Sequence, residues 1–147
     1  MDLEERVRRL EALEAARDLV HAYAAAADSR EIARVLELFA PDAVLHSPRG
    51  VYTGHEQIAE SYAAGWTLEP SLKRHFVTNV RVAPAADGIV TAGADFFHVG
   101  RGDGRSVLGW GRYADRIDAG RRVFTEKRIT LAMSTDLAAG WALEPGP

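Results

Sequence analysis

Apolar residues recur every three to four positions through the first part of the chain, a spacing typical of amphipathic helices. Seven such positions lie among charged ones in residues 3–27, and an alanine-rich end favours the helix further. A capping-box pattern at 28–31 predicts a second helix, which Pro41 should end. Three more elements are expected in this half: strands at 43–47 and 51–52 and a helix over 55–64.

The second half of the chain carries long runs of β-type residues separated by short turns rich in Gly, Asp and Ala. Connections of this length join neighbouring antiparallel strands, so the runs should form a strongly twisted meander. Helices that precede strands are typical of an α+β fold, here a cone with N-terminal helices packed on a strongly curved, mostly antiparallel sheet. The predicted strands span residues 74–83, 88–99, 105–117 and 122–133.

The length of 147 residues fits one domain, which we place at residues 1–135, followed by a C-terminal extension at 136–147. With 18 basic and 21 acidic residues the net charge is −3, which argues against a dedicated nucleic-acid binder. The sequence has no cysteine, so disulfides, thiolate metal sites and a cysteine nucleophile are excluded.

The sequence pattern also argues against a membrane protein and against a secreted protein. No apolar run reaches the ~18 residues that suggest a membrane span, and the acidic N-terminus is unlike a secretory signal. We therefore expect a soluble, cytoplasmic protein with no membrane and no nucleic-acid partner. The histidines lack the spacing of a metal site and the glycine-rich stretch at 100–104 matches no nucleotide-binding loop, so we expect no metal and no cofactor.

Candidate chemistry begins at the end of the first predicted helix. Tyr23 continues the apolar stripe, so its ring should face the core and its hydroxyl should need a partner. Asp28 follows at the junction of two predicted helices, where an Asp commonly serves as a helix N-cap. A cap at the mouth of a pocket can also present a carboxylate oxygen to the pocket, so both roles stay open for Asp28.

His75 is the second candidate, on the first long strand. Strict alternation puts His75 and Val77 on one face and the more apolar Phe76 and Thr78 on the other, which would leave His75 outside the core. A β-bulge or a strong twist at the strand start would reverse this assignment. If His75 reaches Asp28, the carboxylate would fix the imidazole tautomer and raise its basicity, as a general base requires.

Other side chains are weaker candidates for a pocket wall. His46 and His98 lie on predicted strands, but a satisfied structural role is the favoured interpretation for both. Aromatic residues on the later strands should fill the core or pack against a second subunit, and some should line the pocket. The residues we assign to substrate binding are His46, Tyr52, Tyr62, Trp66, Asn79, Phe97, Trp110 and Arg112.

The order of several short motifs resembles a known family. These motifs are Tyr23-Ala-Ala-Ala-Ala-Asp28, Leu-Phe-Ala-Pro-Asp-Ala at 38–43, Gly-Val-Tyr-Thr-Gly at 50–54, Arg-His-Phe-Val-Thr-Asn at 74–79 and Gly-Arg-Tyr-Ala-Asp at 111–115. Together they resemble the SnoaL-like branch of the nuclear transport factor 2-like superfamily, over roughly residues 8–132. This superfamily hosts cyclases, dehydratases, isomerases, epoxide hydrolases, dioxygenase β subunits and non-catalytic binders, so the fold alone implies no single activity.

Within the superfamily, the pattern is most similar to scytalone dehydratase and bile-acid 7α-dehydratase. Those enzymes use a Tyr on the first helix, an Asp just after it and a His on the first long strand, and Tyr23, Asp28 and His75 occupy matching places. The resemblance also implies that His75 points inward. The catalytic acid of ketosteroid isomerase has only Asp95 as a distant candidate, and the Asp-Arg-Asp set of limonene epoxide hydrolase lacks a convincing second Asp beside Arg112.

These observations lead to one hypothesis and one alternative. We expect a lyase (dehydratase) or an isomerase or cyclase that works through an enolate on a small hydrophobic, polyketide-, steroid- or terpenoid-like molecule of secondary metabolism. His75 is the proposed acid or base, Asp28 orients it, and Tyr23 stabilises the enolate oxygen. The chain should form a homodimer through its sheet. The alternative is a non-catalytic binding or assembly module, such as a dioxygenase β subunit-like protein.

Overall fold

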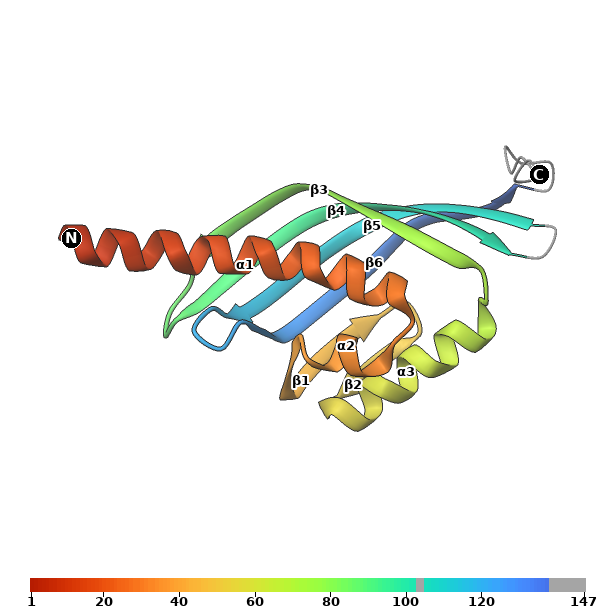
Figure 1. Cartoon of the computed structure of the whole chain (residues 1–147), viewed down its shortest axis with the longest axis horizontal. Coiled ribbons are helices and arrows are strands. Elements are labelled where there is room, and N and C mark those ends of the chain that lie inside the picture. Colours follow the sequence, from red (N-terminus) through yellow and green to blue (C-terminus); the bar gives the residue numbers. More distant parts are fainter. Residues whose placement is uncertain (103–104, 138–147) are drawn as a thin grey trace.

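A computed structural model describes residues 1–102 and 105–137 of the chain. Over this part it contains three helices and six strands (Figure 1), and the third helix lies between the second and third strands of the chain. The expected C-terminal extension at 136–147 lies almost wholly outside the described residues. The elements are α1 (Leu3–Ser29), α2 (Ile32–Leu36), β1 (Phe39–Ser47), β2 (Gly50–Thr53), α3 (Gly54–Leu68), β3 (Leu72–Pro84), β4 (Ile89–Gly102), β5 (Arg105–Asp118) and β6 (Val123–Leu137).

All described strands belong to one sheet with the order β2-β1-β6-β5-β4-β3. Strands β3 to β6 pair antiparallel with their sequence neighbours, which confirms the predicted meander. Strand β1 adds a parallel pairing to β6, so the sheet is mixed, and β2 forms an antiparallel hairpin with β1. Figure 1 shows α1 lying across one face of the long strands, while α2 and α3 gather at one end of the sheet.

The first helices differ from the prediction. Helix α1 continues through Ser29 and ends at Arg30, whose φ of 58° is the left-handed conformation that often closes a helix. Helix α2 starts only after Glu31 and has no side-chain cap, so the predicted capping box at 28–31 is wrong. Asp28 therefore belongs to the last turn of α1 and is not an N-cap.

Pro41 lies inside strand β1, where the sequence had suggested the end of a helix. A strand can hold a proline where its ladder is interrupted, because proline has no N–H to donate. The register between β1 and β6 shifts between Phe39 and Val44, which provides that interruption. Helix α3 is longer than the predicted 55–64 and includes Gly65 and Trp66.

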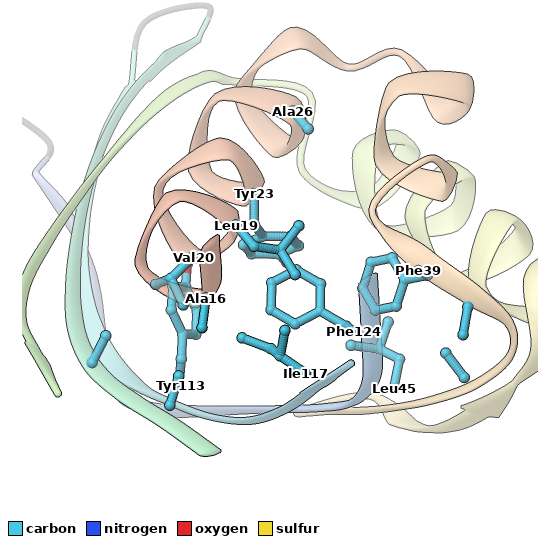
Figure 2. Close-up of a cluster of buried hydrophobic side chains, with 14 of the residues drawn as sticks. Ala16, Leu19, Val20, Tyr23, Ala26, Phe39, Leu45, Tyr113, Ile117 and Phe124 are labelled. Carbon is cyan, nitrogen blue, oxygen red and sulfur yellow. The ribbon is translucent and has the colours of Figure 1, made fainter. Parts of the chain in front are cut away.

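The core lies between α1 and the concave face of the sheet. Figure 2 shows Leu19, Val20 and Tyr23 of α1 pointing toward side chains of the sheet. The Tyr23 ring meets Phe124 and Tyr113 edge-on at centroid distances of 5.9 and 5.5 Å. Tyr23 faces the core, in agreement with the apolar stripe read from the sequence. No helix in the described ranges is long and apolar enough to span a membrane.

A bulge in β3 decides which side chains of this strand face the helix. Asn79 has a left-handed φ of 55°, and the register with β4 shifts between Thr78 and Arg81. His75 and Val77 are partly buried on one side of the bulge, whereas Phe76 is 54% exposed. The expectation that Phe76 and Thr78 share the core face is therefore wrong, and the bulge lies four residues beyond His75 rather than at the strand start.

Candidate active site

A cavity of about 190 Å³ opens between the end of α1, helix α3 and the concave face of the long strands. Its wall is mostly apolar, and a few polar side chains converge on it, which is the usual make-up of a small-molecule site. Among these polar groups are an aspartate–histidine pair, a pair of tyrosines and an arginine from the turn between β1 and β2.

Asp28 and His75 are in direct contact across 47 positions of sequence. The Asp28 Oδ1 atom lies 2.6 Å from His75 Nδ1, and Oδ2 accepts the main-chain N–H of His75 at 2.9 Å. The side chains are only 8% and 18% exposed. Because the carboxylate accepts from Nδ1–H, the other ring nitrogen Nε2 carries the lone pair. The contact that the sequence predicted between these two residues is present.

A second histidine accompanies this pair. The rings of His75 and His98 are 5.3 Å apart between centroids, and both side chains line the cavity. Burial most of all, and then the proximity of His75, lowers the pKa of His98 to about 4, so His98 is neutral near pH 7. Its Nδ1 has no hydrogen-bond partner among the described residues. The favoured interpretation of His98 as a satisfied structural histidine is thus wrong.

The hydroxyl groups of Tyr23 and Tyr62 meet at 2.5 Å in the same cavity. Burial raises the pKa of both hydroxyls above the usual value for tyrosine. Both are therefore neutral, and one of the two donates to the other while its partner keeps a proton to offer. The partner that the sequence required for the Tyr23 hydroxyl is Tyr62, which comes from α3.

Below the tyrosines lies an ion pair that the sequence analysis missed. The Lys127 Nζ atom contacts both carboxylate oxygens of Asp115, at 3.2 and 3.1 Å, and both side chains are 0% exposed. The ammonium also lies 4.0 and 3.9 Å from the ring centroids of Tyr23 and Tyr113. Burial lowers the pKa of Lys127 and raises that of Asp115, and the mutual attraction opposes both changes.

Strand alternation gave no indication that Lys127 is buried. In a regular strand Lys127 and Phe124 would face opposite sides. The β5–β6 register shifts between Arg116 and Ile117, which pair with Glu126 and Phe124, so Thr125 is an extra residue. This bulge turns both Phe124 and Lys127 toward the core. No local sequence signal distinguishes such a lysine from a surface one.

Of the eight residues assigned to substrate binding, Tyr62 and Trp66 line the cavity. His46 instead pairs with Glu126 at 3.2 Å, and Tyr52 packs against the core. The other four have exposed side chains on strands β3, β4 and β5, outside the cavity lining. Their assignment fails because alternation and the bulges turn them away from α1: Asn79, Phe97, Trp110 and Arg112.

Asp95, considered as a distant counterpart of an isomerase acid, lies among these exposed residues. It accepts from Asn79 Nδ2 at 2.9 Å and from Arg112 Nε at 3.2 Å. These partners lower its pKa, the hydrogen bond from Asn79 most of all. Within the described residues, no group of three or more His, Asp or Glu side chains is arranged to hold a metal ion.

Comparisons with known proteins identify a family and many structures of similar shape. A family model described as a SnoaL-like domain matches residues 8–135. The structure of a type 2 hexachlorocyclohexane dehydrochlorinase is 23% identical, with a TM-score of 0.81, and the match covers 97% of this chain and 99% of that chain. No curated protein matches the chain significantly.

Two further structures come from Novosphingobium aromaticivorans. A candidate scytalone dehydratase is 15% identical, with a TM-score of 0.72 and 92% of each chain covered. The β subunit of a candidate aromatic-ring-hydroxylating dioxygenase is 18% identical, with a TM-score of 0.72, covering 86% of this chain and 92% of that chain. At these identities the likeness shows the fold, and it confirms the α+β architecture predicted from the motifs.

Proposed function

The chain belongs to the SnoaL-like domain family, and from that premise we propose that it is an acid–base enzyme of the lyase type. It eliminates a leaving group from a small hydrophobic molecule and needs no cofactor. The observation that carries the proposal is the buried contact between Asp28 and His75 at the cavity wall. Imidazole held by a carboxylate is the arrangement best suited to move a proton near neutral pH.

In the proposed reaction, His75 Nε2 removes a proton from a carbon next to a substrate carbonyl. The electron pair of that C–H bond forms the enolate, then the new double bond as the leaving group departs from the neighbouring carbon. A hydroxyl leaves as water, with the proton that His75 had taken. Asp28 stabilises the imidazolium, and the Tyr23–Tyr62 hydroxyl pair donates to the oxygen on which charge develops. Isomerisation and ring closure share this enolate, so a polyketide-, steroid- or terpenoid-like substrate decides the outcome.

Elimination is the favoured outcome because two of the similar structures carry that chemistry in their names, a dehydrochlorinase and a candidate dehydratase. The test uses phenyl-substituted β-hydroxy ketones as probes, both neutral and carrying a carboxylate, with the near-ultraviolet absorbance of the conjugated enone as the signal. His75→Ala should lower turnover by about 10²–10⁴-fold, the usual contribution of a positioned acid–base group. Asp28→Asn should also lose activity, because one of its two contacts to His75 is lost.

The matched control is His46→Ala, since His46 is also a partly buried strand histidine but does not line the cavity. This variant should keep wild-type turnover. A His75→Ala protein as active as wild type, or a wild type that dehydrates none of the probes, would remove the support for the proposal. The alternative, a non-catalytic assembly module, is favoured by the similarity to a dioxygenase β subunit.

We also propose that the chain forms a homodimer through the exposed face of its sheet. Phe76, Phe97, Trp110 and Met133 are successive cross-strand partners on β3, β4, β5 and β6. Each is between 40% and 54% exposed, so they form one apolar row across four strands, here called the outer row. A contiguous apolar surface of this kind is typical of a protein interface.

A further inference from the structure

Arg49 is a cation of the cavity wall that has no acidic partner among the described residues. Arg49 comes from the turn between β1 and β2, and its Nη2 donates to the main-chain carbonyl of Ser61 on α3 at 2.9 Å. No ion pair to Arg49 exists in the described part of the chain. A guanidinium has five N–H donors, so most of its donors remain available beside the cavity.

Helix α3 is shaped to receive this guanidinium. Gly65 is a buried residue of α3, and a Cβ atom there would lie only 2.7 Å from Arg49 Cζ and 2.8 Å from Nη1. Only the missing side chain lets the planar group lie this close to the helix. Glycine inside a helix is less stable than alanine there, so its presence needs a packing reason, and Arg49 supplies one.

The surroundings of Arg49 favour a negatively charged ligand. Arg30, Arg49 and Lys73 line the cavity with only two carboxylates, although the whole chain has a net charge of −3. Arg30 is held by main-chain carbonyls of Trp66 and Pro70. The positive side chains of Arg30 and Arg49 thus both bind main-chain carbonyl groups on or just after α3.

A second polar group at this wall also lacks a partner. The Ser61 hydroxyl is buried, and no described residue hydrogen-bonds to it, although the same residue's carbonyl holds Arg49. Buried polar groups are normally satisfied, and an exception next to a cavity points to a ligand or to water.

We propose that Arg49, which packs against Gly65, binds a carboxylate group of the substrate. The substrate class is then a small hydrophobic acid rather than a neutral molecule. The planar guanidinium matches a carboxylate through paired hydrogen bonds, which fixes the direction of the ligand as well as its affinity. A carboxylate on Arg49 also keeps the negative end of the ligand away from Asp28, so the hydrophobic part lies toward His75. The substrate assignment rests on the proposed function, but the binding site itself does not require turnover.

The test compares two probes of equal shape, naphthoate and its neutral amide, by calorimetry at low ionic strength. Wild type should bind naphthoate about tenfold to a hundredfold more tightly than naphthamide, which corresponds to about 1.4–2.8 kcal/mol. Arg49→Met should abolish this preference, and Arg49→Lys should keep only part of it. Gly65→Ala should also weaken it, because the added methyl group displaces the guanidinium while the charge is unchanged.

Two control variants separate this proposal from others. Arg112→Met removes an arginine outside the cavity and should leave the preference unchanged. His75→Gln should keep the preference even where activity is lost, so failure of the proposed reaction and failure of the carboxylate site give different results. Equal affinity of wild type for both probes, binding of neither at millimolar concentration, or a preference that survives in a folded Arg49→Met protein would overturn the proposal.

Discussion

The ammonium group of Lys127 lies in the centre of the core, surrounded by three aromatic rings. Besides Tyr23 and Tyr113, the Phe124 ring is within 4.5 Å of Nζ. Cation–π contacts strengthen when the cation is removed from water, and here they add to the ion pair with Asp115. A buried pair is nonetheless costly to desolvate, so its value depends on both members being present.

This dependence gives a prediction for single and double variants. Lys127→Met should lower the free energy of unfolding by about 3–5 kcal/mol, because it leaves the Asp115 carboxylate buried without a counter-charge. The double variant Lys127→Met/Asp115→Leu should recover much of that loss, since apolar side chains of similar volume can replace a buried pair. Urea denaturation measures both. A double variant less stable than Lys127→Met would contradict this account.

Residue by residue, the sequence supports some site predictions and not others. Asp28 and His75 were candidates from their places in the predicted elements, but only the resemblance implied that His75 points inward, because a contact across 47 positions leaves no periodic signal. Lys127 was missed and His98 was interpreted wrongly, because burial of a polar residue depends on neighbours from other strands. Arg49 is one of many arginines spread along the chain. Only its close packing against Gly65 distinguishes it from the others.

Among the elements, strand β3 depends on the bulge at Asn79. Side chains that face α1 are His75 and Val77 before the bulge and Val80 and Val82 after it, a spacing of three residues across the break. Bulges bend and twist a strand. The bend lets β3 keep one face on the helix along its whole length, so the element that carries His75 owes its curvature to Asn79.

Asn79→Val should therefore lower the free energy of unfolding by about 1–2 kcal/mol, because a β-branched residue is strained at positive φ. The side-chain hydrogen bond to Asp95 is lost in the same variant. Thr78→Val is the matched control: Thr78 is exposed, and the substitution should change stability by no more than about 0.5 kcal/mol. Equal stability of the two variants in thermal denaturation would show that the left-handed residue is not needed.

The element boundaries show where sequence patterns stop being informative. The long strands and α1 were predicted to within a few residues, because their periodicity extends over many positions. Helix α2 has only five residues, too few for a periodic signal, and Pro41 misled the boundary between α2 and β1. The parallel pairing of β1 with β6 is a long-range contact, which no local pattern could indicate.

The whole molecule has an apolar outer row on the side of the sheet away from α1. If the outer row is the proposed dimer interface, light scattering at micromolar concentration should give about twice the monomer mass of 16.0 kDa. Trp110→Glu should give a folded monomer, because a buried unpaired charge opposes association. Val51→Glu, at an exposed apolar residue on β2 outside the outer row, should leave the dimer intact. A wild-type monomer would refute the interface.

Asp28 joins the end of α1 to β3 through both the ring and the main chain of His75. Contacts between segments so distant in sequence carry a large loop-closure entropy, so we expect this one to form after local turns and hairpins. The proposed general base is consequently not assembled in a partly folded chain that lacks this contact, even one that has all its helices and most of its hairpins. Far-ultraviolet circular dichroism would count such species as structured, whereas catalysis would register only molecules that had completed the last step of assembly.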